Sequence, residues 1–185
     1  MILPITAYGH PILRKKTVEF DENYPGLQEL INNMFETMYK SQGVGLAAPQ
    51  VNRSLRLFII DATPMGNDVE EFKDFKRAFL NPYILEESGE TWSFNEGCLS
   101  IPGVREDVKR PDWIKIEYYD ENWELHEEEF SGIPARIIQH EYDHLDGILF
   151  PDRLSSLKKR LLKSKLSAIT AGKVDVDYRM IFPKK

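Results

Sequence analysis

The chain has 185 residues, a formal net charge of −6 and a composition that is 42% hydrophobic and 29% charged. These values exclude a disordered or fibrous protein and favour one globular domain over residues 1–185. The only cysteine is Cys98, so no disulfide can form within the chain, which fits a reducing compartment. Because no apolar run approaches about 18 residues and the N-terminus lacks a secretory signal, we expect a cytoplasmic protein with no membrane contact.

The charge is distributed unevenly along the chain. Residues 153–173 carry seven cations and no acid, so the rest of the chain is strongly acidic. An acidic surface repels nucleic acid phosphates, and we therefore expect no DNA partner. Any contact with RNA would have to use the basic segment.

Apolar spacing and turn residues predict the secondary structure in chain order. We expect a helix from about residue 27 that ends at Gly43, strands over 55–61 and 79–85, a hairpin of strands over 113–119 and 123–130, a helix from Pro134 to about Asp146, and a last helix over about 155–171. Residues 61–77 are the most loop-like interior stretch. Strands followed by isolated helices, with no alternation of strand and helix, indicate an α+β fold.

The strongest single motif is His140-Glu141-Tyr142-Asp143-His144. On a helix, residues four apart lie on the same face, so His140 and His144 can bind one cation. Glu141 then lies beside that cation and can act on a bound water. The alternative is an exposed helix that carries two histidines by chance.

A catalytic metal site of this type needs a third protein ligand and one open position. No histidine follows His144. The remaining candidates are His10, His126, Cys98, and carboxylates such as Asp146 and Asp152. We prefer Cys98, because Gly97 before it lets the backbone approach closely. A turn residue is the simpler interpretation of His10, and a solvated strand face that of His126.

Two further segments accompany this motif. Residues 43–50 read GVGLAAPQ and residues 96–100 read EGCLS. In this order with QHEYDH at 139–144, they resemble the three signature motifs of the peptide deformylases, and the resemblance extends from about residue 8 to about residue 153. It implies an α+β fold with antiparallel sheets packed around a central HExxH helix. The sequence pattern adds a basic C-terminal helix over about 153–172.

The resemblance also implies an activity. Such enzymes are metal-dependent hydrolases that remove the formyl group from the N-terminal formyl-methionine of newly made polypeptides and release formate. The implied metal ligands are Cys98, His140 and His144. Native enzymes of this kind generally use Fe2+, with Zn2+, Ni2+ or Co2+ able to substitute, and this donor set by itself suits several of these ions.

The catalytic roles implied by the resemblance fall on four residues. Glu141 takes the proton of the attacking water and later passes it to the departing amine. The side-chain amide of Gln50 and the backbone N–H of Leu99 donate to the formyl oxygen as an oxyanion hole. Glu96 lies behind the metal-binding histidines and orients them, with an ordinary surface acid as the alternative.

Spacing also predicts a pocket for the methionine side chain of the substrate. The apolar residues that can form its wall are Val44, Leu99, Ile133 and Ile137. The last two share a helix face with His140. Gly45 leaves room for a peptide laid along it as an added strand. Arg105 is interpreted either as an anchor for substrate or a loop, or as part of a surface salt bridge.

The basic C-terminal segment allows two interpretations. Its leucines follow a helical stripe with Lys and Arg on the opposite face, which fits a helix packed on the body. Docking on the ribosome through RNA, known for some deformylases, is the functional alternative and would depend strongly on salt. The stretch over 61–77 looks longer than in compact members of the family.

Two other functions compete with a deformylase. A metallopeptidase has the same helix motif but takes its third ligand downstream, where this chain offers no histidine or glutamate. A non-catalytic module with a structural metal would need a fourth ligand from the protein. Loss of turnover without loss of metal in Glu141→Ala would distinguish catalysis from a structural role.

Overall fold

The structure is a computed structural model that describes residues 1–65 and 72–184. The helices are α1 (Leu27–Lys40), α2 (Gly132–Leu145) and α3 (Ser156–Thr170); the strands are β1 (Ile5–Thr6), β2 (Gly45–Ala47), β3 (Leu57–Asp61), β4 (Lys76–Cys98), β5 (Ile101–Tyr119), β6 (Leu125–Ser131) and β7 (Met180–Ile181). The three predicted helices are confirmed, each to within a few residues.

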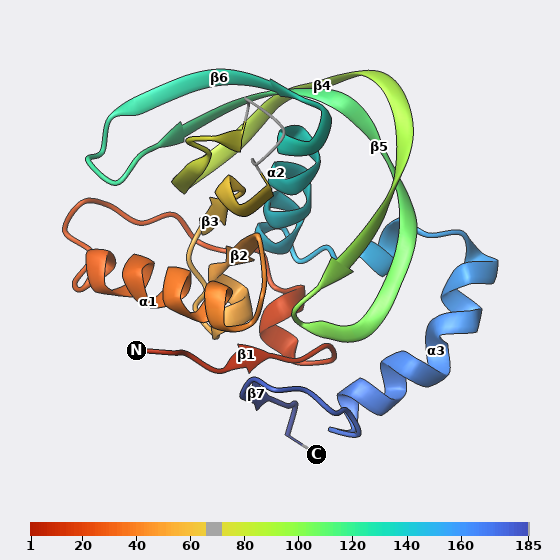
Figure 1. The fold of residues 1–185 in the computed structure, drawn as a ribbon. Coiled ribbons are helices and arrows are strands. Elements are labelled where there is room, and N and C mark those ends of the chain that lie inside the picture. The colour runs from red at the N-terminus through yellow and green to blue at the C-terminus, as the bar shows by residue number, and fades with distance from the viewer. Residues whose placement is uncertain (66–71, 185) are drawn as a thin grey trace.

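One antiparallel sheet of five strands forms the framework of the molecule. Its strand order is β2-β3-β4-β5-β6, and each strand pairs with the next along the chain. The β4–β5 pair is a long ribbon whose register shifts at several points, and such bulges bend and twist a strand pair. In Figure 1 this ribbon arches around α2, which confirms the predicted antiparallel fold around a central helix.

The core lies on both faces of β3. Successive side chains of a strand point to opposite faces, so Leu57 and Ile59 join one apolar cluster, formed with α1, while Phe58 and Ile60 join another, formed with α2. The first cluster also holds Met34 and Met38 of α1, as the helical spacing of the sequence predicts. Packing on both faces therefore holds the sheet in place, with β2 beside α2.

Helix α2 is buried on most of its surface, including Ile137, Ile138 and His144. It contacts β2, β3, β5 and β6, so neighbouring elements surround it. The chain leaves the helix through Gly147, whose φ of +74° is the left-handed conformation that ends many helices. A Cβ at Gly147 would lie 2.7 Å from the backbone oxygen of Arg14, so only glycine fits this exit.

Helix α3 lies at the periphery of the molecule (Figure 1) and packs against it with one face. Its buried residues are Leu162, Leu166 and Ile169. Leu157 and Leu161, which the leucine stripe of the sequence placed with them, are 64% and 71% exposed. The stripe is therefore narrower than predicted, and two leucines stand among the exposed cations of the helix.

A second, two-stranded sheet joins the ends of the chain. After α3 the chain turns back, and β7 pairs with β1 in parallel, with Ile5 opposite Met180 and Thr6 opposite Ile181. The backbone N–H groups of Ile5 and Ala7 donate to the carbonyl oxygens of Arg179 and Ile181, both at 2.8 Å. This small sheet has no counterpart in the sequence predictions, because strands of two residues carry no periodic signal.

The strand predictions found only part of the long ribbon. Strands were expected over 79–85 and 113–119, but β4 runs to Cys98 and β5 begins at Ile101. The loop expected over 61–77 is shortened, since Lys76 and Arg77 already belong to β4, and residues 66–71 lie outside the described part of the chain. Within the described residues, no helix is long and apolar enough to cross a membrane.

Candidate active site

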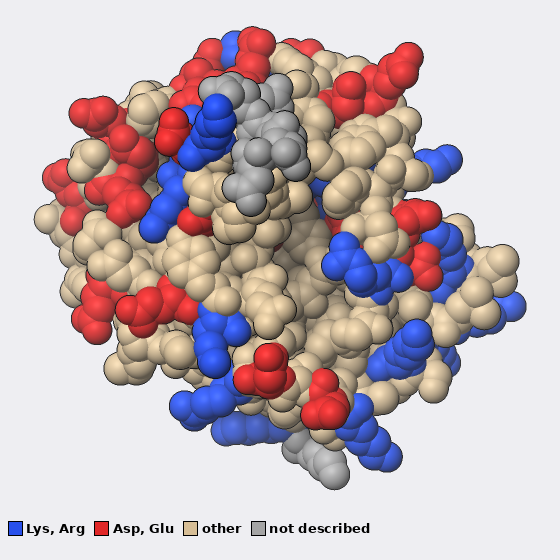
Figure 2. Space-filling view, in the orientation of Figure 1, with Lys and Arg blue, Asp and Glu red and all other residues tan. Residues whose placement is uncertain are grey.

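A cavity of about 910 Å³ opens beside the middle of α2. Figure 2 shows the hollow near the centre of this face of the molecule, with mostly uncharged side chains around it and basic side chains at one side. All three sequence motifs reach it, from the segment before β2, from the end of β4 and from α2. Residues of the C-terminal segment between α3 and β7, Asp175 to Tyr178, also line it.

The three predicted metal ligands converge beside this cavity, which Cys98 and His140 line. Cys98 Sγ and ring nitrogens of His140 and His144 all lie within 4.8 Å of one another, and Cys98 Sγ lies 3.4 Å from His144 Nε2. The histidines come from successive turns of α2, and Cys98 is the last residue of β4. The antiparallel ribbon thus returns a distant cysteine to the helix that carries both imidazoles.

The other ligand candidates of the sequence are engaged elsewhere. His10 Nδ1 accepts from the backbone N–H of Ile12 at 3.3 Å, in a turn as expected. His126 Nε2 lies 3.0 Å from Asp120, on β6. Asp146 and Asp152 form ion pairs with Arg56 and Arg14. None of these four residues lines the cavity.

The residues present fit a divalent metal ion. One thiolate and two imidazoles form a three-ligand donor set of the kind that leaves a fourth position open. Glu141 Oε2 is buried beside them without a hydrogen-bond partner among the described residues. A buried carboxylate oxygen without a partner is costly in free energy, so this atom is suited to bind a water molecule or a substrate group in the cavity.

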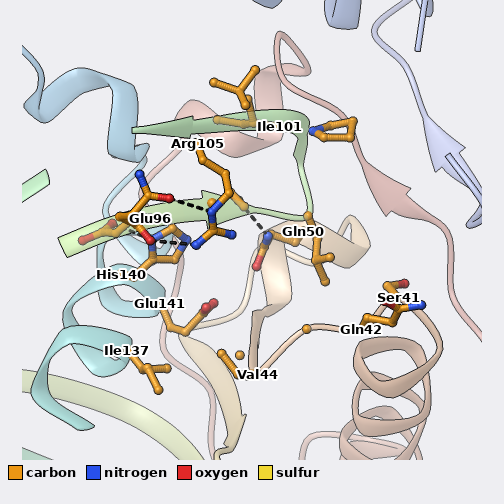
Figure 3. A pocket seen from close by; sticks show the side chains of 18 of the residues that line it. Ser41, Gln42, Val44, Gln50, Glu96, Ile101, Arg105, Ile137, His140 and Glu141 are labelled. Carbon is orange, nitrogen blue, oxygen red and sulfur yellow. Dashed lines mark hydrogen bonds and ion pairs between the residues drawn. The ribbon is translucent and has the colours of Figure 1, made fainter. Parts of the chain in front are cut away.

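Glu96 contacts the first histidine. Its Oε2 lies 2.9 Å from His140 Nδ1, which leaves Nε2 of that ring free to face the cavity. Figure 3 shows Glu96 behind His140, with Glu141 on the cavity side. Glu96 is 4% exposed, so the alternative of a surface acid is wrong.

Two buried arginines hold Glu96. Arg110 donates to both of its carboxylate oxygens, at 2.7 and 3.0 Å, and Arg136 donates to Oε1 at 2.9 Å. Burial alone would raise the pKa of Glu96, but the hydrogen bonds from His140 and Arg110 outweigh it and hold the pKa well below its usual range. Glu96 is therefore ionised and accepts from the imidazole.

Asp143 extends the network along α2. Its carboxylate accepts from Arg110 Nη1 at 2.7 Å and from Arg153 Nε and Nη2 at 2.6 Å each. The sequence motifs predict no role for Arg110 or Arg136. A signal was present for both: Arg136 precedes His140 by four residues on one helix face, and Arg110 continues the buried alternation of Val104 and Val108.

The protonation of the remaining groups follows their burial. Burial raises the pKa of Glu141 to about 7, although the charge on His140 opposes this rise. Burial and the charge on His140 lower the pKa of His144 well below its usual value, which favours the neutral imidazole that ligation requires. The pKa of His140 moves upward, because the bonds to Cys98 and Glu96 outweigh its burial.

Gly45 makes room for Glu141. A Cβ at Gly45 would lie 2.5 Å from Glu141 Oε1 and 2.8 Å from its Cγ. Gly43 lies against Leu99 in the same way, where a Cβ would be 2.9 Å from the leucine Cδ1. The two glycines of the first motif therefore pack against the other two motifs.

Gln50 reaches the end of β4. Its Oε1 accepts from the backbone N–H of Ala47 at 2.8 Å, which turns the amide nitrogen toward Cys98 Sγ at 3.3 Å and Ser100 Oγ at 3.2 Å. The Leu99–Ser100 turn joins β4 to β5 at this point. Gln50 and Leu99 both line the cavity, and the Gln50 amide contacts the residues on either side of Leu99. Figure 3 shows the Gln50 side chain at the cavity.

The apolar wall predicted from the sequence is present. Val44, Leu99, Ile133 and Ile137 all line the cavity. Arg105 lies at its edge, where Nε and Nη2 donate to the side chain and backbone of Asn95 at 2.8 and 2.7 Å. A Cβ at Gly97 would lie 2.6 Å from Arg105 Nη1, so this glycine seats the guanidinium.

A family profile for polypeptide deformylase matches residues 2–160. The chain belongs to the polypeptide deformylase family. It is 59% identical to a peptide deformylase of Christiangramia forsetii, over 99% of this chain and 97% of that one, and 54% identical to one of Flavobacterium johnsoniae, over 98% and 96%. The three sequence motifs predicted that this chain belongs to the family, and this prediction is confirmed.

Solved structures agree with the family assignment. A peptide deformylase from Plasmodium falciparum superposes with a TM-score of 0.82 at 39% identity, covering 91% of this chain and 95% of that one. One from Thermotoga maritima gives 0.75 at 41% identity, covering 84% and 99%. The chain is therefore a metal-dependent enzyme of the deformylase type, which acts on N-terminal formyl groups of newly made polypeptides.

Proposed function

We propose that Cys98, His140 and His144 hold the metal of this deformylase and that Glu141 is its general base. The observation that supports this most directly is the convergence of one sulfur and two ring nitrogens beside a buried carboxylate oxygen that lacks a partner. A divalent ion bound there supplies Lewis acidity and an acidified water. The pKa of Glu141, about 7 before any ion binds, suits proton transfer near neutral pH.

The chain's own residues do the rest of the chemistry. Glu141 accepts the proton of the water and delivers it to the amine nitrogen that leaves. Gln50 Nε2 and the backbone N–H of Leu99 donate to the formyl oxygen as negative charge develops on it, and loss of one such donor costs about 3 kcal/mol of barrier. Glu96 keeps the His140 ring in place by accepting from Nδ1.

The apolar wall is proposed to take the methionine side chain of the substrate. Val44 comes from the segment before β2, Leu99 from the turn between β4 and β5, and Ile133 and Ile137 from α2. An unbranched thioether chain adapts well to such a wall. Gly45 leaves the edge of β2 free for the peptide backbone, and Arg105 faces the downstream part of the peptide.

The metal is proposed to be Fe2+, with Zn2+, Ni2+ or Co2+ as working substitutes. A single thiolate with two imidazoles binds each of these ions. Purification without oxygen protects both iron and thiolate from oxidation. We expect iron in such preparations and higher formate release than after zinc exchange; stoichiometric zinc with full activity would contradict the proposal.

Replacing Glu141 tests the function. In Glu141→Ala, we expect the metal content to stay at the wild-type level while formate release from formyl-Met-Ala-Ser falls by about 10²- to 10⁴-fold. Glu22→Ala, at an exposed glutamate outside the cavity, serves as the control and should keep full activity. Unchanged turnover in Glu141→Ala would refute the base assignment.

The exposed cations of α3 are proposed to bring the enzyme to the ribosome. Lys159, Arg160, Lys163 and Lys165 are exposed on this helix, and Leu157 and Leu161 stand among them. Cations arranged on one exposed helix suit RNA phosphates, and the two leucines suit a neighbouring apolar patch. This role concerns delivery of the enzyme to nascent chains and leaves the chemistry on free peptides unchanged.

A further inference from the structure

The segment between α3 and β7 forms part of the catalytic cavity. Residues 175–178 are among those that line it. The family profile ends at residue 160, so this segment lies outside the part of the chain that the three motifs and the profile cover. Nothing in the assignment of metal ligands or donors involves it.

One side chain of this segment reaches the proposed oxyanion hole. The hydroxyl of Tyr178 donates to the backbone carbonyl of Leu99 at 2.8 Å. Tyr178 and Leu99 are both half-buried and pack against the same apolar cluster. The carbonyl that accepts this bond belongs to the residue whose N–H is the proposed donor to the formyl oxygen.

The Leu99–Ser100 turn is held at several points. The N–H of Tyr8 donates to the carbonyl of Ser100 at 2.8 Å, and Gln50 donates to the Ser100 hydroxyl. Tyr8 follows β1 and Tyr178 precedes β7. The small parallel sheet therefore brings both residues next to the Leu99–Ser100 turn. The pairing of the chain ends is thereby coupled to the turn that carries Cys98 and Leu99.

We propose that Tyr178 is a positioning residue for the deformylase reaction, which holds the Leu99 backbone so that its N–H points at the formyl oxygen. A turn of two residues between strands can rotate its peptide planes, and the Tyr178 bond fixes the carbonyl on one side of Leu99. Oxyanion donors act through preorganisation, so a freely rotating donor stabilises the transition state less. The role rests on the function proposed above for Leu99.

The hydroxyl is available as a donor over the working pH range. Burial raises the pKa of Tyr178 to about 12, and the nearby Cys98 and Asp177 act in the same direction. Its effect on the reaction should therefore be the same at every pH at which the enzyme is assayed. If removal of the hydroxyl lowered the rate only on the acidic or only on the basic limb of the pH profile, Tyr178 would have a different role.

Tyr178→Phe tests the inference in the metal-loaded enzyme. We expect kcat for formyl-Met-Ala-Ser to fall about tenfold, with KM changed by less than twofold and metal content unchanged. Amide hydrogen exchange at Leu99, followed by NMR on zinc-loaded protein, should become faster. Tyr118→Phe is the matched control, since it also removes a hydrogen-bonded tyrosine hydroxyl, from the sheet away from the cavity.

The outcomes separate the inference from the proposed function. A Tyr178→Phe enzyme with wild-type kcat, or one that loses stability as Tyr118→Phe does and nothing else, would overturn the positioning role. Gln50→Ala, measured in parallel, reports on the oxyanion hole itself. Loss of kcat in Gln50→Ala with full activity in Tyr178→Phe overturns the positioning role alone, whereas full activity in both also overturns the proposed oxyanion hole.

Discussion

Three glycines of the motifs lie where the backbone approaches a side chain of the site closely. Gly45 faces Glu141, Gly43 faces Leu99 and Gly97 faces Arg105, each at a distance that a Cβ would violate. From the sequence, Gly45 was interpreted as room for the substrate. The structure adds a second reason, which is room for the carboxylate of Glu141.

Gly45→Ala should therefore disable the enzyme at the site. The new methyl group forces Glu141 to move, and we expect kcat on formyl-Met-Ala-Ser to fall by about 100-fold, since misplacement by about 1 Å costs this much. Gly26→Ala is the control: it lies before α1 with a φ of +73° and open space around it. It should lower the melting temperature while leaving kcat intact; equal losses of kcat in both variants would contradict the steric explanation.

The pKa of Glu141 gives a stability prediction for enzyme stripped of metal by a chelator. Glu141 titrates near 4.5 when unfolded and at about 7 in the fold, so the folded state binds more protons between these values. The free energy of unfolding consequently falls as pH rises through this window. Glu141→Gln removes the penalty and should melt several degrees above wild type at pH 8, with little difference at pH 4.5.

The matched comparison uses zinc-loaded protein. A bound cation favours the charged carboxylate, so the difference between Glu141→Gln and wild type should shrink across the same pH series. Melting curves that stay parallel from pH 4.5 to pH 8 without metal would contradict the burial of an ionisable Glu141.

At the level of elements, one arginine joins three segments. Arg110 on β5 bridges Glu96 on β4 and Asp143 on α2, and all three side chains are almost fully buried. Arg110→Met would leave two carboxylates in the interior with fewer partners. We expect a loss of about 3–5 kcal/mol in the free energy of unfolding, measured by urea titration at saturating zinc.

The control for this variant is Lys115→Met. Lys115 pairs with Glu127 across β5 and β6 on the surface, where solvent screens the interaction. No measurable change is expected there. A similarly small change for Arg110→Met would mean that the buried network contributes little to holding α2 against the ribbon.

The helices were predictable from the sequence and the long ribbon was not. Apolar residues in 27–40 and 134–145 recur with a helical period. Residues 86–97 of β4, in contrast, are mostly polar, and most of their side chains are exposed or half-buried. Their strand conformation comes from pairing with β5, which no local pattern reports. Cys98 was found because the motif of α2 lacked a third ligand, while Tyr178 lay beyond every motif and became visible only through the pairing of β7 with β1.

At the scale of the whole molecule, the exposed cations of α3 are not among the residues that line the cavity. A Lys159→Glu and Lys163→Glu double variant should bind ribosomes at least tenfold more weakly in cosedimentation at low salt, with unchanged kcat on formyl-Met-Ala-Ser. Lys115→Glu and Lys109→Glu place the same charge change elsewhere. Equal ribosome binding by wild type and the α3 variant would reject the docking role.

The convergence of Cys98, His140 and His144 on a single ion is tested most directly by X-ray absorption at the zinc edge of fully loaded wild-type enzyme. We expect one sulfur neighbour at about 2.3 Å, two imidazole nitrogens at about 2.0–2.1 Å and one further light atom from solvent. A coordination shell without sulfur, or one closed by a fourth protein ligand, would contradict the proposed catalytic centre.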